Sequence, residues 1–199
     1  NGDLDPEAMI AAIGPKTKLV AMSHMSNVLG TVFDVKPVID AAHARGVPVL
    51  VDGSQAAVHM PVDLDALGAD FYAITGHKLY GPSGSGAIAI KSERMAEMRP
   101  FIGGGDMIRD VHRDEVIYND PPMKFEAGTP GIVQQIGLGV ALDYMMDVGM
   151  EAIAAHERPI DGIVLASFGD TGAREVRRRY PDLPVLGIAE AAFAGVRRI

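Results

Sequence analysis

ITGHKLYGP, at residues 74–82, is the stretch that decides the fold, and it follows VLVDGSQ at residues 49–55 by one strand–helix–strand step. In both stretches an apolar strand runs into a glycine-containing turn that carries a charged side chain, Lys78 in one and Asp52 in the other. Strands and helices alternate in this part of the chain and recur roughly every twenty residues, which indicates a mainly parallel sheet covered by helices. We therefore expect an α/β fold, in which ligands bind outside the carboxyl ends of the strands.

The hydrophobic pattern predicts four strands and three longer helices. The predicted strands are 18–22, 47–51, 70–74 and 86–91, and the predicted helices are 5–13, 35–45 and 133–147. Between residues 101 and 122, glycine, proline and charged residues interrupt this pattern. We expect a long functional loop there.

The composition of the chain excludes several classes of function. With 199 residues and 48% hydrophobic side chains, the chain can bury a sizeable core. A net charge of −8 disfavours nucleic-acid and anionic-membrane surfaces, and no apolar run approaches the length of a membrane span. There is no cysteine, which excludes disulfides and thiolate metal sites, and no signal peptide opens the sequence. We expect a cytoplasmic protein without a metal site.

The pairing of Lys78 with Asp52 is the one needed to hold pyridoxal phosphate. A lysine amine forms a Schiff base with the cofactor's aldehyde, and a carboxylate keeps the pyridine nitrogen protonated so that the ring can accept electrons. Either residue alone also fits an ordinary structural role, as a surface lysine after a strand or as an aspartate that caps a helix. Their position behind strongly apolar strands and inside glycine-bracketed turns favours the functional interpretation.

Residues 1 to about 157 resemble the middle of a cysteine desulfurase of the class V aminotransferase group, with fold type I, nearest to the SufS branch. Six segments in the expected order carry the resemblance. They are TKLV at 17–20, SNVLGT at 26–31, VDGSQ at 51–55, TGHKLYGP at 75–82, GGGDMI at 103–108 and FEAGTP at 125–130. The resemblance implies an α/β large domain, incomplete at both ends, because the family's N-terminal third and C-terminal small domain have no counterpart here.

The resemblance also implies roles for single residues around the cofactor ring. Lys78 would be the Schiff-base lysine and Asp52 the partner of the pyridinium nitrogen. Gln55 would hydrogen-bond the phenolic oxygen, and Asn27 would lie close to the same edge of the ring. For Asn27, ordinary turn chemistry is the alternative.

Three further residues would serve the phosphate group. Thr75 and His77 would contact the phosphate, and Thr129 would reach the phosphate of a neighbouring subunit's cofactor, which implies a homodimer with shared sites. Turn or capping chemistry is the alternative for Thr75 and Thr129. The remaining histidines match no family role and are expected to be surface or packing residues; they include His24, His43, His59, His112 and His156.

The implied activity is a lyase and transferase reaction of sulfur metabolism, the conversion of L-cysteine to L-alanine with sulfur transfer for iron–sulfur cluster assembly. A sulfur-acceptor protein would be a partner. The family's sulfur step uses a cysteine nucleophile, and this chain has none. We therefore expect the chain by itself to be inactive or impaired as a desulfurase, and whether it acts as an enzyme stays open.

The tail resembles a different family. DGIVLASFGDTG at 161–172 and LPVLGIAEAA at 183–192 are similar to the Asp/Glu/hydantoin racemases, whose first catalytic cysteine is replaced here by Ser167. We therefore divide the chain into a partial transferase-like domain at 1–157 and a racemase-like α/β fragment at 158–199. A racemase-related protein and a non-catalytic α/β fragment are the alternative functional hypotheses.

Overall fold

The central element is a four-stranded sheet. The computed structural model describes residues 4–157, 163–165, 178, 181 and 185–187. Three strands, β1 (Val20–Ser23), β2 (Val49–Asp52) and β3 (Phe71–Thr75), run parallel, and β4 (Gly86–Ile90) joins β3 in the antiparallel direction. The predicted mainly parallel α/β fold is confirmed, and each predicted strand lies within about two residues of an observed one.

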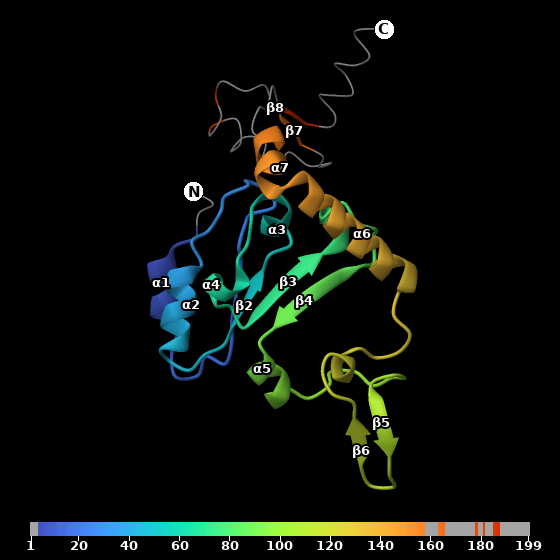
Figure 1. Cartoon of the computed structure of the whole chain (residues 1–199). Coiled ribbons are helices and arrows are strands. Elements are labelled where there is room, and N and C mark those ends of the chain that lie inside the picture. Colours follow the sequence, from blue (N-terminus) through green and yellow to red (C-terminus); the bar gives the residue numbers. More distant parts are fainter. Residues whose placement is uncertain (1–3, 158–162, 166–177, 179–180, 182–184, 188–199) are drawn as a thin grey trace.

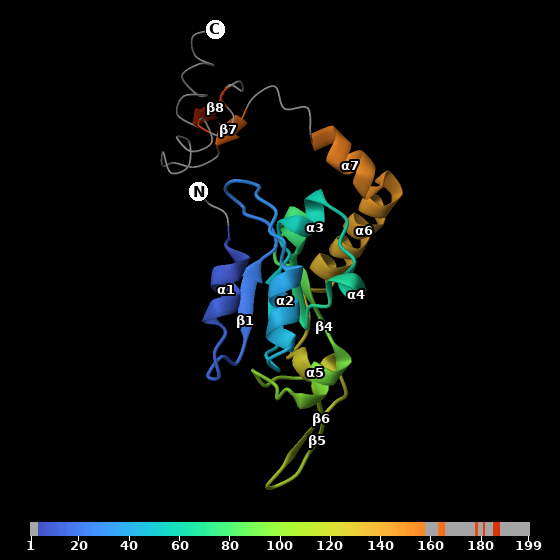
Figure 2. The same ribbon diagram turned by 90° about the vertical axis from the view of Figure 1, so that its left-hand side faces the viewer.

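Helices cover the two sides of this sheet. Figures 1 and 2 show α1 (Pro6–Ala12) and α2 (Lys36–His43) on one side, and α6 (Ile132–Val148) and α7 (Met150–Glu157) on the other. The shorter elements are α3 (Ala56–His59), α4 (Leu64–Leu67), α5 (Ser92–Glu97) and the 3₁₀ turns η1 (Gly76–Lys78) and η2 (Met123–Phe125). The three predicted helices correspond to α1, α2 and α6.

Two apolar clusters hold these layers together. The first joins α2 to the sheet, where Val38 and Ile39 pack with the fully buried Val49 and Val51. The second packs α6 and α7 against α3 and the turn after β3, with Leu79 almost fully buried at its centre. Each β2 valine faces the core because alternate residues of a strand point to the same face.

The segment expected to be a loop contains a hairpin. Strands β5 (Ile108–Val111) and β6 (Val116–Tyr118) pair in the antiparallel direction, with a register shift between Ile108 and Asp110, and project away from the sheet in Figure 1. The prediction of a long loop at 101–122 was therefore wrong for this part. Most side chains of the hairpin are exposed, so its strands lack the regular apolar alternation that marks a half-buried strand.

The tail is described only in part. Two short strands, β7 (Ile163–Leu165) and β8 (Val185–Gly187), pair in parallel. Ser167, on which the racemase comparison depends, lies outside the described residues. The division of the chain at residues 157 and 158 stays a prediction.

The described residues hold neither a candidate membrane span nor a candidate metal-ligand cluster. No helix there has both the length and the apolar character that a membrane crossing requires. The same residues contain no group of three or more potential metal ligands from histidine, aspartate and glutamate.

A buried carboxylate ties the amino ends of the strands to the helices. Asp70 is 2% exposed and accepts hydrogen bonds from the Val49 backbone N–H at 2.7 Å and from Arg94 Nε at 2.8 Å. His43 Nε2 lies 2.7 Å from Asp70 Oδ2, the same oxygen that accepts the hydrogen bond from Val49. Burial alone would raise the pKa of Asp70, but the hydrogen bonds from Arg94, His43 and Val49 outweigh it and hold the pKa below its ordinary value.

Replacing Asp70 should destabilise the fold. We expect Asp70→Asn to lower the free energy of unfolding by about 2 to 3 kcal/mol, because the amide cannot serve three donors and leaves the Arg94 guanidinium without its counter-charge. Urea denaturation at pH 7 measures the loss. Asp40→Asn, which removes only the exposed pair with Lys36, is the control and should cost about 0.5 kcal/mol or less.

The same pair of chains gives a pH test. Because the folded-state pKa of Asp70 is depressed, its stabilisation is present above the ordinary carboxyl pKa and is lost as the pH falls through the folded-state pKa. The difference in stability between the wild-type chain and Asp70→Asn should therefore shrink in acid. An Asp70→Asn chain as stable as Asp40→Asn at pH 7 would contradict this role of Asp70.

Candidate functional site

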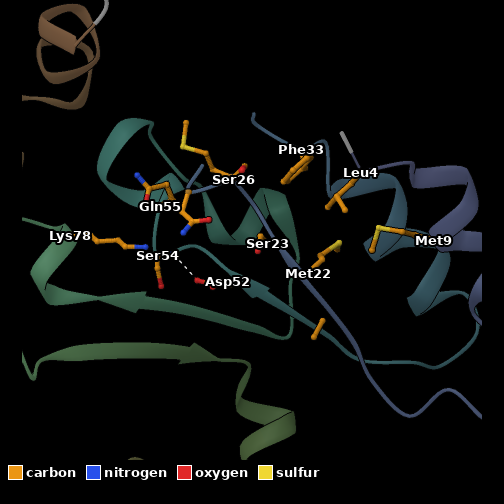
Figure 3. A pocket seen from close by; sticks show the side chains of 13 residues that line it. Leu4, Met9, Met22, Ser23, Ser26, Phe33, Asp52, Ser54, Gln55 and Lys78 are labelled. Atoms are coloured by element: carbon orange, nitrogen blue, oxygen red, sulfur yellow. Dashed lines mark hydrogen bonds between the residues drawn. The ribbon is translucent and has the colours of Figure 1, made fainter. Parts of the chain in front are cut away.

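The predicted site residues meet at the carboxyl ends of the parallel strands. A cavity of about 470 Å³ opens there, and Asn27, Asp52, Gln55 and Lys78 are among the residues that line it. Figure 3 shows the amine of Lys78 pointing toward Ser54 and Asp52, with Gln55 beside them. One basic, one acidic and two amide side chains therefore surround a common space.

Asp52 owes its place to the end of β2. It is the last residue of the strand and pairs with Ser23 of β1 and Ala73 of β3. Its carboxylate accepts a hydrogen bond from the Ser54 backbone N–H at 2.9 Å, which fixes the side chain while leaving it exposed toward the cavity. The next residue must be glycine, because a Cβ on Gly53 would lie 2.0 Å from the ring of Tyr72.

Lys78 is presented by a tight turn built around Gly76. The carbonyl of Gly76 accepts hydrogen bonds from the backbone N–H groups of Leu79 and Gly81, and the Gly76 N–H donates to Ser85, each at 2.9 Å. A Cβ on Gly76 would lie 1.9 Å from the Ser85 hydroxyl, so the close approach requires glycine. Because Leu79 anchors the turn in the core, the neighbouring Lys78 side chain extends into the cavity.

Gln55 and Asn27 complete the cavity wall from two different turns. Gln55 immediately precedes α3. Asn27 lies in a turn in which the Ser26 hydroxyl accepts from the Val28 and Leu29 N–H groups at 3.3 and 3.2 Å. Ser26 therefore does the capping in this turn, and Asn27 lines the cavity.

The three predicted phosphate ligands do not line this cavity. Thr75 ends β3 and His77 lies in η1 directly before Lys78; the two side chains contact each other, with 3.0 Å between Thr75 Oγ1 and His77 Nδ1. Thr129 is exposed and follows Gly128, whose positive φ of 85° turns the chain. The structure thus brings four of the seven predicted residues together, and the phosphate roles of the other three stay predictions.

His24 and Tyr72 form a buried pair, of which Tyr72 was not singled out from the sequence. The Nδ1 atom of His24 lies 3.0 Å from the hydroxyl oxygen of Tyr72, and the two rings meet edge to face. Of the two roles expected for His24, surface or packing, the structure shows the packing one, since the ring is buried, and burial lowers its pKa. Burial and the negative charge of Asp52 raise the pKa of Tyr72 to about 12. The only sequence feature that could have pointed to Tyr72 is its hydroxyl-bearing side chain within the apolar run FYAI at 71–74.

This donor set fits pyridoxal phosphate. An amine can bind the aldehyde carbon, a carboxylate can pair with the ring nitrogen, and amide side chains can hydrogen-bond the phenolic oxygen. Lys78, Asp52, Gln55 and Asn27 supply these groups around one cavity.

Comparison with known proteins points in the same direction. The aminotransferase class-V family matches residues 1–196. A probable cysteine desulfurase of Xylella fastidiosa is 50% identical over 157 residues, which cover 79% of this chain and 38% of that protein. The chain therefore spans about two fifths of the length of such curated relatives.

Two solved structures share the fold. The cysteine desulfurase CsdA of Escherichia coli has a TM-score of 0.71 and 42% identity, over 74% of this chain and 37% of that one. A lysine variant of C-DES with glycine covalently linked to its PLP cofactor has a TM-score of 0.67 and 31% identity, over 79% and 41% of the two chains. The class-V match extends through the tail to residue 196, and the racemase alternative gains no support from these comparisons.

The Tyr72 environment predicts a loss of stability in alkali. An unfolded tyrosine ionises near pH 10, whereas the folded-state pKa is about 12, so the stabilisation is complete below pH 10 and lost as the pH rises through 12. Relative to Tyr72→Phe, the wild-type free energy of unfolding should fall by about 2 kcal/mol across this range. Urea denaturation from pH 9 to 11.5 measures it. Tyr144→Phe, at an exposed tyrosine, should keep the wild-type profile. Parallel pH profiles for the wild-type chain and Tyr72→Phe would refute the prediction.

Proposed function

The chain belongs to the class-V aminotransferase family, and from this premise we propose that it carries the lysine-bearing cofactor site of a pyridoxal-phosphate-dependent cysteine desulfurase. One observation carries the proposal. Lys78 and Asp52, which lie 26 positions apart in the numbered sequence, line the same cavity at the carboxyl ends of the strands. The similarity to named cysteine desulfurases supports the reaction class.

Each residue of the cavity would have a definite task. The Lys78 amine would bind the aldehyde carbon of the cofactor and later carry a proton to or from the α-carbon of the substrate. The negative charge of Asp52 would keep the ring nitrogen protonated. Gln55 would hydrogen-bond the phenolic oxygen, with Asn27 beside it. Bound pyridoxal phosphate would supply an electron sink for the bonds at the α-carbon.

The phosphate and the partner subunit belong to the same proposal. Thr75 and His77 would contact the phosphate, which needs the turn before Lys78 to approach the cofactor. Thr129, exposed on its loop, would reach the cofactor of a second subunit in a homodimer. This arrangement would explain why Thr129 does not line the cavity of its own chain.

The proposed substrate is L-cysteine, with L-alanine as product and sulfur passed to an acceptor protein for iron–sulfur cluster assembly in the cytoplasm. Transfer of sulfur through a persulfide needs a thiol nucleophile. These 199 residues contain no cysteine, so the thiol would come from outside them.

Incubation with pyridoxal phosphate should label Lys78. We expect borohydride reduction followed by peptide mass spectrometry to locate the cofactor on this residue. The dissociation constant of the cofactor should be larger than about 1 μM. Lys78→Ala should abolish the specific label, whereas Lys16→Ala, at an exposed lysine, should not. Equal labelling of several lysines in the wild-type chain and in Lys78→Ala would count against the proposed cofactor site.

The chain alone should exchange the substrate's α-proton slowly but release no sulfide. Exchange in deuterated water needs only the lysine and the cofactor ring, and it should disappear in Lys78→Ala. It should fall at least roughly tenfold in Asp52→Asn, because a neutral amide cannot stabilise the protonated ring nitrogen. Sulfide release from cysteine at about 1 per second or faster by the purified chain would show that no external thiol is required.

A further inference from the structure

A line of hydrogen bonds leaves the cavity at Gln55 and ends on the last described helix of the main body. Gln55 Nε2 lies 2.8 Å from His59 Nε2, and His59 Nδ1 lies 2.7 Å from Glu157 Oε2. Gln55 and His59 are one helical turn apart at the two ends of α3, and Glu157 is the last residue of α7. Residues that are 98 positions apart in sequence are thereby joined behind the cavity wall.

The chemistry of the three side chains determines where the protons lie. An ionised carboxylate only accepts hydrogen bonds, so the His59 nitrogen that faces Glu157 must carry the proton. In the neutral imidazole the other nitrogen is then an acceptor, and it takes a hydrogen bond from the amide N–H of Gln55. Glu157 therefore selects one tautomer of His59, and that tautomer selects one orientation of the Gln55 amide.

The contact is partly shielded from solvent. The side chains of His59 and Glu157 are 30% and 33% exposed, less than the side chains of the exposed ion pair between Lys36 and Asp40. Partial burial and the charge of Glu157 raise the pKa of Tyr80, which lines a second cavity together with Glu157. Tyr80 is the second residue after Lys78, so the carboxylate lies near the turn that presents the lysine.

We propose that His59 and Glu157 are positioning residues, which hold the Gln55 amide in one orientation at the wall of the cofactor cavity. An amide that rotates freely offers a carbonyl as often as an N–H, and only an N–H can stabilise a phenolic oxygen. With one N–H held by His59, the amide plane is fixed before the cofactor arrives. The meaning of this inference rests on the proposed function, but its first test does not.

The first test uses the chain without cofactor. Nitrogen-15 NMR of the histidine rings should show His59 as the Nδ1–H tautomer. The Gln55 side-chain amide should give one set of signals, as expected for a single orientation. Glu157→Gln should mix the two tautomers and also shift the Gln55 amide signals, because His59 links the two side chains. Glu151→Gln, an exposed carboxylate on the same helix, should change neither signal.

The second test is a double-mutant cycle read by titration with pyridoxal phosphate. Glu157→Gln should weaken cofactor binding about fivefold to tenfold in the wild-type background. In a Gln55→Ala background the same substitution should have no further effect, because the group that it positions is gone. A merely structural role of Glu157 would weaken both backgrounds equally.

The outcomes separate this inference from the proposed function. Unchanged His59 and Gln55 signals in Glu157→Gln overturn the positioning role, and so does an equal loss of affinity in both backgrounds. If the wild-type chain binds no cofactor, the proposed function fails and the NMR result alone decides the positioning role. Should Glu157→Gln lose its folded circular dichroism spectrum, Glu157→Asp, which retracts the carboxylate from His59, takes its place with the same expectations.

Discussion

The parallel pairing of β1, β2 and β3 is the constraint on which the rest of the structure depends. The ladder sets Ser23 beside Asp52 and Asp52 beside Ala73, so the strands end at one common edge. A slip of β2 by one residue would turn Val49 and Val51 out of the core and move Asp52 to the other face of the sheet. Because both valines are fully buried, the apolar core holds the carboxylate at the cavity.

Close backbone packing then converts two strand ends into rigid turns. Gly53 passes over the ring of Tyr72, and Gly76 passes over Ser85, at distances that admit no Cβ atom. Burial of Leu79 fixes the second turn from below. The flexible Lys78 side chain is therefore attached to a backbone that packing has already placed, which lowers the entropic cost of holding its amine near Asp52.

The two ends of the sheet serve different purposes. At the amino ends, Asp70 is buried and its carboxylate is occupied by contacts with Val49, His43 and Arg94. At the carboxyl ends, Asp52 is exposed toward a cavity. Stability and ligand binding thus rest on separate carboxylates. The contact between Glu157, at the end of α7, and His59 supports the cavity side of the sheet.

The sequence by itself determined the α/β class, the strands, and the pairing of Lys78 with Asp52, because apolar runs and glycine-bracketed turns are local signals. Only the tertiary structure decided which predicted residues share a cavity, since Thr75, His77 and Thr129 fit the same motifs yet lie outside it. It also decided the β5–β6 hairpin, the roles of Tyr72 and Asp70, and the contact between His59 and Glu157. The contacts of Tyr72, Asp70 and Glu157 join segments that lie far apart in the sequence, and no local pattern records that choice. The hairpin is local, but its mostly exposed strands lack the apolar alternation that would have marked them.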